Sequence, residues 1–538
     1  MKNRVFVFGI DGGTFSVIRP AVAAGRLPVL GRLLAEGAHG DLESTVQPIT
    51  PMAWSSFATG VNAGKHGIFD FARLEGGRPR LNTAGDRAAP AVWSLLSAAG
   101  RPATVVNVPF TYPPEEIHGI MIPGFDAPRV ERAIFHPEAL YDELTARFGP
   151  YRLDWTFPIG QRLDLERYLQ TIRDTVRHRG DTGLYLLDRQ PWDLFVIVFT
   201  STDHAQHVFW QHPEGQAIIE GVYAEVDRQL GRFLAALPPD VTVLVMSDHG
   251  AGPIRHLVYL DNWLAREGFL ARPAAAGAGS LARRAKSALR RLLPTGLRKA
   301  LRAGLPGVKN RLDRAILRSG VDWSQTRAYA SGMYGNIRLN LQGREPEGIV
   351  PPADYDRVCR EIMDRLATLT DPASGQPLVA AVRRRHELYH GPCLDQAPDL
   401  VIVWQDYACF TKKGIDQGET IFGDRLMVDA SDYPHTGTHR LEGIFLAHGP
   451  GVAPQAGVQA RIIDLAPTIL ALLGEPVPAH MDGRVLAEVF PQLAGALPAA
   501  SGGAAGQGPA LKKGAAVTPE EKEALIERLK SLGYIEEG

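Results

Sequence analysis

Short runs of consecutive apolar residues recur along the chain, and each run ends in polar residues. Runs of this kind cover residues 5–10, 194–199, 241–246 and 400–404. Continuous apolar runs are typical of strands buried on both faces, in a parallel or mixed sheet covered by helices. Helical periodicity lies between them, for example over residues 163–189 and 216–236. The pattern therefore predicts an α/β fold whose central, mostly parallel sheet is covered by helices.

Three of these runs lead into an aspartate. Asp11 ends the first run, Asp203 lies just beyond the second, and Asp248 follows the third. In open α/β sheets, ligands bind outside the carboxyl ends of the strands. The three aspartates therefore indicate a functional site at that edge of the sheet.

Composition narrows the class of protein. The 538 residues carry 58 Lys+Arg against 59 Asp+Glu, a net charge of -1, and 45% of them are apolar. These values exclude an intrinsically disordered chain and a polybasic nucleic-acid binder, so no nucleic acid is expected as a partner. The length allows about three domains, or one large α/β domain with insertions.

The chain divides into five predicted segments. Residues 1–265 and 327–494 form the two parts of the core, the second with cap elements, and 266–326, 495–517 and 518–538 form a basic helical insertion, a flexible linker and a C-terminal helix. The linker is rich in Ala, Gly and Pro. Thr518 and Pro519 then supply an N-cap and a proline at the first helical position, which predict a small docking helix.

Within the insertion, residues 281–318 carry twelve Lys/Arg and one acid, Asp313. We expect these residues to form short basic amphipathic helices, for which two interpretations stand. They are either a solvated face that covers the core, or a surface for an anionic membrane or an acidic substrate, with peripheral membrane contact through 281–318. The sequence does not predict the oligomeric state.

Cysteine usage and the apolar runs bear on location. Cys359, Cys393 and Cys409 lack metal-ligand spacing, and an odd number does not suit a disulfide framework. No stretch reaches the roughly 18–20 apolar residues of a transmembrane helix. The first apolar run is too short for a signal-peptide core. We therefore expect buried thiols in a reducing compartment and a cytoplasmic protein.

Six residues have side chains suited to metal binding: Asp11, Asp203, His207, Asp248, His249 and His439. Each alone is more typical of a helix cap, a turn or a buried core histidine. Asp203 and His207 are four residues apart, which places them on one face of a helix. Mixed carboxylate and imidazole ligands suit Zn²⁺ or Mn²⁺ and suit Ca²⁺ poorly. Six such ligands suffice for two adjacent metals if one more oxygen is supplied.

Thr50 is the candidate for that oxygen. It precedes Pro51 and a helix-compatible stretch, so its hydroxyl is expected at a helix N-terminus. One interpretation is a plain N-cap threonine. The other is a nucleophile, because a helix N-terminus and a nearby divalent cation both favour loss of the hydroxyl proton.

On these residues the chain resembles the alkaline phosphatase superfamily and, within it, the type I phosphodiesterase/nucleotide pyrophosphatase branch. The likeness extends to bacterial and archaeal proteins described as predicted phosphohydrolases or phosphomutases. It rests on Asp11, Thr50 ten residues before Gly60, Asp203-x-x-x-His207, Ser247-Asp248-His249-Gly250, and His439 ten residues before Gly449-Pro450-Gly451. It covers residues 1–265 and 327–490 and implies an alkaline-phosphatase-like core.

The resemblance also implies a ligand set. Asp203, His207 and His439 would hold one metal, while Asp11, Asp248, His249 and the Thr50 oxygen would hold the other. His435 is a rival for the last histidine, and the family spacing favours His439. Zinc fits this set first and manganese second.

The implied activity is that of a metal-dependent phosphoric ester hydrolase, a phosphodiesterase first, acting on a small-molecule or lipid phosphate ester. It would form a phospho-threonine at Thr50, which a metal-bound water then attacks. The alternative is a phosphomonoesterase or phosphomutase with the same metal centre. A sulfatase is disfavoured, because Thr50-Pro51-Met52-Ala53-Trp54 lacks the Cys/Ser-x-Pro-x-Arg pattern. In a further class of function, the metal site is structural and 281–318 binds a membrane surface.

The sequence departs from these relatives at one position. Nucleotide pyrophosphatases carry an asparagine that donates to a phosphoryl oxygen where this chain has Phe71, 21 residues after Thr50, with Asp70 beside it. An ionised carboxylate cannot donate, so phosphate recognition must come from other residues. The candidates are Asn62, Lys65, Asn107 and Asn336.

Overall fold

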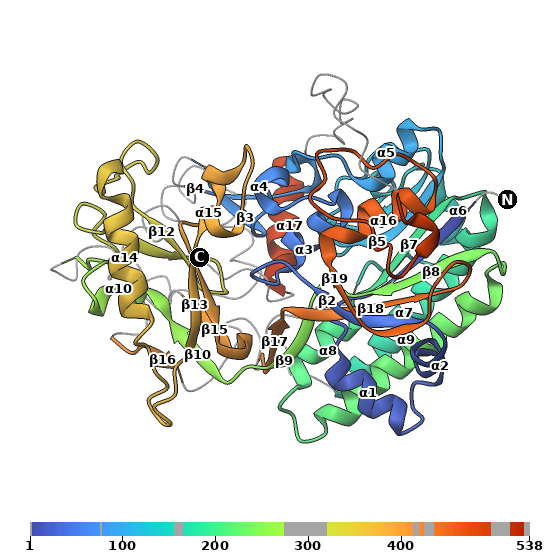
Figure 1. The fold of residues 1–538 in the computed structure, drawn as a ribbon, viewed down its shortest axis with the longest axis horizontal. Coiled ribbons are helices and arrows are strands. Elements are labelled where there is room, and N and C mark those ends of the chain that lie inside the picture. The colour runs from blue at the N-terminus through green and yellow to red at the C-terminus, as the bar shows by residue number, and fades with distance from the viewer. Residues whose placement is uncertain are drawn as a thin grey trace, which may run out of the picture.

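The computed structural model describes residues 3–75, 78–154, 165–273, 320–412, 419–423, 435–495 and 517–531. The basic stretch 281–318 and nearly all of the predicted linker lie outside these residues. The described chain forms two lobes, a larger one around the central sheet and a smaller one on the left of Figure 1.

The central sheet has eight strands in the order β19-β2-β18-β8-β1-β7-β5-β6. These strands are β1 (Arg4–Ile10), β2 (Ala38–Glu43), β5 (Ala103–Val108), β6 (Gly119–Pro123), β7 (Leu194–Phe199), β8 (Val241–Met246), β18 (Glu442–His448) and β19 (Gln455–Arg461). β18 runs antiparallel to both of its neighbours, and every other pairing in the sheet is parallel. The predicted mostly parallel α/β sheet is confirmed.

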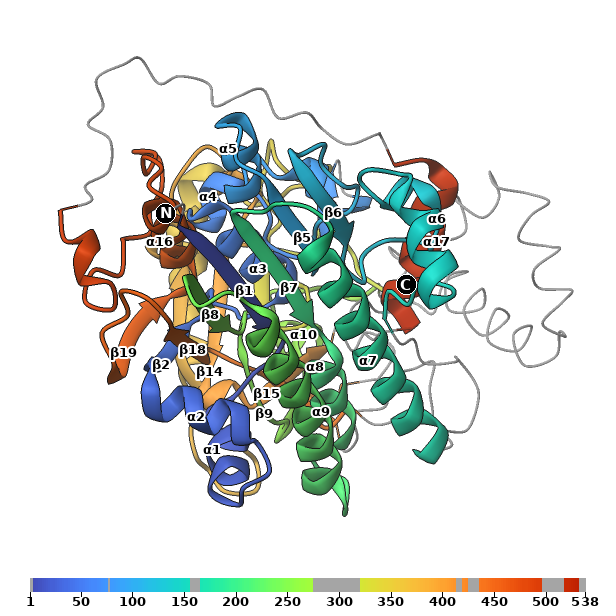
Figure 2. The same ribbon diagram turned by 90° about the vertical axis from the view of Figure 1, so that its right-hand side faces the viewer.

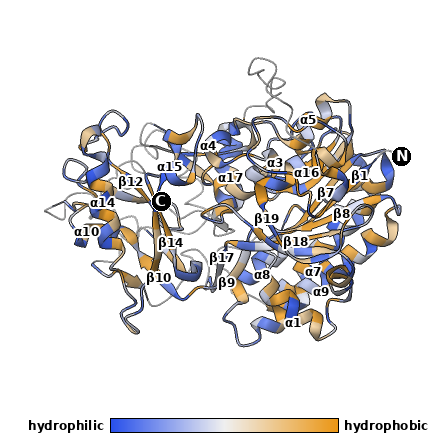
Figure 3. Cartoon of the chain, in the orientation of Figure 1, coloured by the Kyte–Doolittle hydropathy of each residue, from blue (hydrophilic) through white to orange (hydrophobic). Residues whose placement is uncertain are grey.

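Helices cover both faces of this sheet because its strands are apolar on both sides. The alternation of side chains along β1 sends Phe6 and Phe8 to one face and Val5 and Val7 to the other. The first face is covered by α1 (Phe15–Ala23), α2 (Pro28–Glu36), α7 (Leu165–Arg189) and α9 (Gly215–Ala236), and the second by α3 (Thr50–Thr59), α5 (Val92–Ala98) and α16 (Leu465–Leu472) (Figure 2). The orange sheet strands of Figure 3 lie inside this shell.

The smaller lobe has a core of its own. It contains a four-stranded sheet, β11 (Ala328–Ser331), β12 (Asn336–Leu339), β14 (Leu400–Trp404) and β13 (Val379–Arg384), and a three-stranded sheet, β15 (Cys409–Lys412), β10 (His256–Tyr259) and β16 (Phe422–Gly423). Helices α10 (Leu260–Arg266) and α14 (Tyr355–Leu366) pack against them. The remaining elements are α4 (Ala63–His66), β3 (Ala72–Glu75), β4 (Arg78–Leu81), α6 (Leu140–Phe148), α8 (Ser201–Phe209), β9 (Gly250–Pro253), α15 (Arg385–Leu388), β17 (Gly437–Arg440) and α17 (Pro519–Ser531).

A further apolar cluster joins the two lobes and the C-terminal helix α17. It contains Ile49 and Met52 beside Thr50, Tyr334 from the smaller lobe, and Leu525 and Leu529 from α17. The Arg528 side chain of the same helix donates from Nε to the Phe125 carbonyl oxygen over 2.6 Å. The end of the chain is therefore built into the junction between the lobes.

The sequence also makes predictions about the cysteines and about membrane-spanning segments. Cys359, Cys393 and Cys409 are buried and unpaired. Among the described helices, none combines the length and the apolar character that a membrane crossing requires.

Candidate active site

The parallel order of three central strands brings the predicted aspartates to one edge. β1 lies between β7 and β8 and is parallel to both. Asp11 directly follows β1, Asp248 follows β8, and Asp203 lies in the first turn of α8, which follows β7. The carboxyl ends of the strands therefore carry all three carboxylates, as the sequence predicts.

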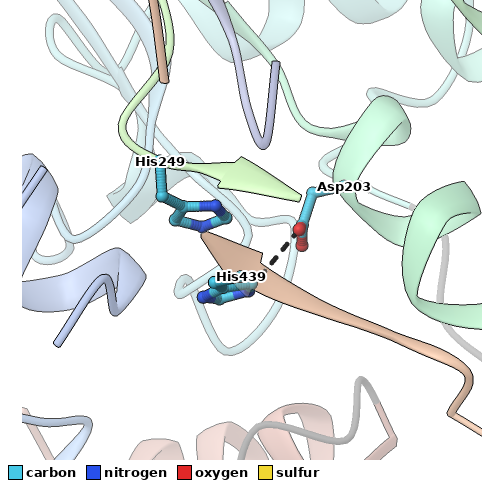
Figure 4. Close-up of side chains that lie close together, drawn as sticks. All are labelled: Asp203, His249 and His439. Atoms are coloured by element: carbon cyan, nitrogen blue, oxygen red, sulfur yellow. Dashed lines mark ion pairs between the residues drawn. The ribbon is translucent and has the colours of Figure 1, made fainter. Parts of the chain in front are cut away.

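His439 reaches the same edge on a short two-stranded ribbon. β9 begins immediately after His249 and pairs antiparallel with β17, so that His439 lies opposite Ala251. The imidazole rings of His249 and His439 stack with their centroids 3.5 Å apart. Figure 4 shows this pair with the Asp203 carboxylate beside it.

The side chains form two overlapping groups with the spacing of metal ligands. One contains Asp203, His249 and His439 and the other Asp11, Asp248 and His249, and the ligand atoms of each lie within 4.8 Å of one another. His249 Nε2 lies 3.2 Å from Asp248 Oδ2 and 3.8 Å from Asp11 Oδ1. His439 Nε2 lies 3.6 Å from Asp203 Oδ1. His249 thus belongs to both groups, whereas the resemblance implied that it holds one metal.

His207 lies beside the first group, and His435 lies outside both. His207 Nε2 is 3.3 Å from Asp203 Oδ1 and 3.0 Å from His439 Nε2. The His435 ring stacks on His207 with the centroids 5.2 Å apart. Burial, with the charge of His207, lowers the pKa of His435 to about 3. The structure therefore brings His439 into the groups of ligands, in preference to its rival His435.

Backbone carbonyls fix how the three histidines are oriented. The Nδ1 atoms of His207, His249 and His439 lie 2.9, 3.0 and 2.6 Å from the carbonyl oxygens of Gly437, Gly250 and Pro48. A carbonyl oxygen only accepts, so each Nδ1 carries the hydrogen. Each Nε2 then keeps its lone pair toward the carboxylates, which is the arrangement of metal-binding histidines.

The electrostatics of the groups favour bound cations. Burial, together with the charges of Asp248 and Asp203, raises the pKa of Asp11 well above its ordinary value. Burial also raises the pKa of Asp248, to about 6. For Asp203, burial raises the pKa, but the His207 and His439 imidazoles in their protonated form would outweigh burial and lower the pKa well below its usual range, so this carboxylate favours cationic partners. A divalent cation would reverse the repulsion among these carboxylates.

Buried polar atoms without hydrogen-bond partners also indicate that cations bind here. Asp11 Oδ1, Asp248 Oδ2, His249 Nε2 and Thr50 Oγ1 form no hydrogen bond within the described chain. Buried polar atoms normally have a partner. This set of nitrogen and oxygen atoms suits the coordination of a divalent metal such as zinc or manganese.

Thr50 is the first residue of α3, but it does not cap the helix. The cap position is Ile49, without a side-chain cap, and the Thr50 side chain is fully buried. The chain on both sides of it touches the two groups of ligands. The Pro48 carbonyl accepts from His439, and Trp54 Nε1 donates to Asp11 Oδ2 over 3.3 Å.

Two of the predicted phosphate-binding residues are engaged elsewhere. Lys65 Nζ lies 2.6 Å from Asp482 Oδ1, and Asn62 Nδ2 donates to Asp482 Oδ2 over 2.8 Å. His390 also contacts this carboxylate, at 3.0 Å. These contacts tie α4 and its cap residue Asn62 to the C-terminal part of the core.

The other two candidates have buried, unsatisfied amide oxygens. Asn107 lies at a bulge at the end of β5 with φ 57, and its Nδ2 donates to the Val198 carbonyl over 3.0 Å. Asn336 begins β12. The Oδ1 atoms of both residues form no hydrogen bond among the residues described.

Tyr334 also lies at this site, although no motif in the sequence marks it. Its hydroxyl oxygen lies 3.2 Å from Nδ1 and 3.5 Å from Nε2 of His439, and the two rings stack with centroids 5.3 Å apart. Burial, and then the charges of Asp203 and Asp70, raise the pKa of Tyr334 well above its ordinary value. A hydrogen bond with the Thr438 side chain acts in the opposite direction and is smaller. The one local signal is the glycine that follows it, Gly335, whose φ of 95 marks a sharp turn between β11 and β12.

Comparison with solved structures shows a shared fold. Phosphonoacetate hydrolase from Sinorhizobium meliloti 1021 is similar in its phosphonoformate complex, with 15% identity, a TM-score of 0.55, and coverage of 88% of this chain and 95% of that one. Its phosphonoacetate complex is similar too, with 14% identity, a TM-score of 0.56 and the same coverage of both chains. Human ectonucleotide pyrophosphatase/phosphodiesterase 5 has 13% identity and a TM-score of 0.48, with coverage of 89% of this chain and 97% of that one.

Sequence comparison gives the family. No curated protein matches the sequence. The family described as type I phosphodiesterase / nucleotide pyrophosphatase matches residues 5–439, well over half of the chain. The predicted alkaline-phosphatase-like fold is confirmed by the phosphonoacetate hydrolase structures. This chain is an enzyme that belongs to the type I phosphodiesterase/nucleotide pyrophosphatase family of the alkaline phosphatase superfamily.

Proposed function

We propose that the protein is a metal-dependent phosphodiesterase with Thr50 as its nucleophile. One observation carries the proposal. The Thr50 hydroxyl is fully buried at a helix N-terminus without a hydrogen-bond partner in the described chain, and residues on both sides of it touch the two groups of ligands. A threonine with only a structural role would use its hydroxyl as a cap or bond it to the backbone.

Two divalent cations complete the proposed site, with zinc the first choice and manganese the second. His249 would face both, Asp203, His439 and His207 would hold one, and Asp11, Asp248 and the Thr50 oxygen would hold the other. Cations at these positions supply Lewis-acid stabilisation of the attacking and leaving oxygens.

The chain's own groups account for the rest of the reaction. Thr50 Oγ1 forms a bond to phosphorus as the bond from phosphorus to the leaving oxygen breaks, which gives a phospho-threonine. The proton of the Thr50 hydroxyl ends on the departing oxygen, so the first product leaves as an alcohol. Water then attacks the same phosphorus as the bond from phosphorus to Thr50 Oγ1 breaks. One proton of the water returns to Thr50 Oγ1, and the second product leaves as a phosphate monoester. Two in-line displacements give net retention at phosphorus. The N-terminus of α3 stabilises the negative phosphoryl group through the positive end of the helix dipole.

The substrate class is a small-molecule or lipid phosphodiester. The family match supports a diester or pyrophosphate linkage. A phosphomonoesterase or phosphomutase with the same centre is the competing function. The twelve basic residues of 281–318 support a contact with anionic membranes as part of the same proposal. The unpaired cysteines support a cytoplasmic location.

The test compares hydrolysis of bis-p-nitrophenyl phosphate and p-nitrophenyl phosphate by the purified protein, with added Zn²⁺ or Mn²⁺. We expect faster cleavage of the diester, and a loss of at least about 10³-fold in kcat for Thr50→Ala. Thr59→Ala is the matched control, because Thr59 is buried in the same helix and its hydroxyl donates to the Ser55 carbonyl. Preference for the monoester would favour the competing function, and a fully active Thr50→Ala variant would exclude Thr50 as nucleophile.

A further inference from the structure

We propose that Tyr334 is a catalytic residue that donates its phenolic hydrogen to a phosphoryl oxygen of the substrate. This inference rests on the proposed function and adds a residue to it. It assigns to the smaller lobe a direct part in phosphate recognition, which the sequence sought in four other residues.

The surrounding structure fixes the Tyr334 ring. The Tyr334 carbonyl oxygen accepts hydrogen bonds from Gln47 Nε2 at 2.7 Å and from Trp404 Nε1 at 3.2 Å. The next residue must be glycine, because a Cβ on Gly335 would lie 2.7 Å from Trp404 Nε1 and its φ of 95 is unfavourable for other residues. The ring packs in the apolar cluster between the lobes. A rigid donor of this kind costs little reorganisation when the substrate binds.

The hydroxyl lies at the metal-binding groups. It is within 3.5 Å of His439 Nε2, and that atom lies 3.6 Å from Asp203 Oδ1 and 3.0 Å from His207 Nε2. The Tyr334 hydroxyl is therefore close to an atom of His439 that also lies near two other proposed ligands. A phosphoryl group bound there would lie within reach of a phenolic donor.

His439 cannot serve as the acceptor for this hydrogen. Its Nδ1 hydrogen is directed at the Pro48 carbonyl, 2.6 Å away, so Nδ1 has no lone pair to offer. Its Nε2 lone pair faces the carboxylates and is needed for a cation. A phosphoryl oxygen is an anionic acceptor, and hydrogen bonds to such groups are the strong ones.

Of the side-chain donors that the sequence offered, Lys65, Asn62 and Asn107 already donate to protein acceptors. Lys65 and Asn62 bind Asp482. The Phe71 ring packs in the apolar cluster, and the Asp70 carboxylate accepts from the Phe71 backbone N–H over 2.7 Å. Tyr334 combines a donor with a position at the groups of ligands.

The variant that tests the proposal is Tyr334→Phe, which removes the hydroxyl and keeps the ring. Tyr389→Phe is its control. Tyr389 packs in the same apolar cluster and its hydroxyl donates to the Val46 carbonyl over 2.7 Å. Four quantities are measured on the full-length, metal-loaded proteins: kcat and KM with bis-p-nitrophenyl phosphate, bound metal per chain, Tm, and the Kd of inorganic phosphate in a Thr50→Ala background.

For Tyr334→Phe we expect kcat to fall about 10²-fold, as for loss of one donor to a transition-state oxyanion. We expect the Kd of inorganic phosphate to rise about tenfold or more, because hydrogen bonds to charged groups are worth about 1.5–3 kcal/mol. Metal content should equal that of the wild type. Tyr389→Phe should lower Tm and leave kcat and the phosphate Kd unchanged.

Unchanged kcat and phosphate affinity in Tyr334→Phe would overturn the proposal. So would a loss of bound metal that accounts for the loss of activity, since that result would make Tyr334 a residue that positions His439. An inactive wild-type protein would overturn the proposed function instead. In that case the phosphate titration, which needs no turnover, still decides whether Tyr334 is a phosphate donor.

Discussion

The Nδ1 atom of His439 donates to the carbonyl oxygen of Pro48 over 2.6 Å, although 391 residues separate the two in sequence. The contact fixes the hydrogen of the imidazole on Nδ1 and directs Nε2 at Asp203. It also connects the last candidate ligand to the segment that begins α3, two residues before Thr50. The proposed nucleophile and one proposed ligand are thus held by the same stretch of backbone.

This relationship distinguishes His439 from His435. We expect His439→Ala to weaken metal binding at least about 100-fold, since even outer partners of metal ligands contribute about 10–100-fold. His435→Ala is the matched control, because its ring is also buried and also packs on His207. Competition with a chromogenic chelator measures both affinities. If His435→Ala loses metal and His439→Ala keeps it, the proposed ligand set is wrong.

Removing a carboxylate from the centre should have opposite effects with and without metal. Burial and two neighbouring carboxylates disfavour a charged Asp11. We therefore expect metal-free Asp11→Asn to be more stable than metal-free wild type, by about 1–3 kcal/mol, and to bind metal more weakly.

Thermal unfolding at neutral pH with EDTA, and then with excess Zn²⁺, measures both effects. Asp41→Asn is the control, because Asp41 is exposed on β2. A metal-free Asp11→Asn variant that is less stable than wild type would show that the buried carboxylates are compensated without metal.

The C-terminal helix should contribute to the stability of the whole protein. Leu525 is buried in the cluster that joins the lobes. We expect Leu525→Ala to lower the free energy of unfolding by about 2–4 kcal/mol, as for other large-to-small changes in a core. Urea unfolding measures the loss. Lys522→Ala, on the exposed side of the same helix, should change it by less than about 0.5 kcal/mol. Equal effects of the two changes would contradict the docking of α17.

Acid stability should depend on Asp482. Burial acts to raise its pKa, but the hydrogen bonds from Lys65 and Asn62 outweigh it and lower the pKa to about 2, from an ordinary value of 3.8. Because the pKa is lower in the folded protein, the carboxylate stabilises the fold above about pH 4, and this contribution is lost as the pH falls toward 2.

Asp482→Asn should therefore have a lower Tm than wild type at pH 6, and the difference should shrink between pH 4 and pH 2.5. Asp395→Asn is the control, because the Asp395 side chain is 89% exposed. A difference in Tm that stays constant over this range would mean that the folded-state pKa is not lowered.

Local sequence determined the fold class and the candidate ligands. Apolar runs such as 194–199 predict strands buried on both faces. The aspartates just beyond three of these runs can be identified without knowing the loops between the strands. Parallel strands share one carboxyl edge, so Asp11, Asp203 and Asp248 meet there whatever lies between them in sequence. The helix that begins with Thr518-Pro519 follows from local capping in the same way.

Tertiary structure decided the contacts between distant segments. His249 belongs to both groups of ligands because the β9–β17 ribbon stacks its ring on His439. Asn62 and Lys65 are bound to a carboxylate more than 400 residues away, and Tyr334 reaches the centre from the other lobe. Contacts of this kind depend on how separate elements pack. Sequence patterns encode the buried face of each element, but not which side chain of another element will lie against it.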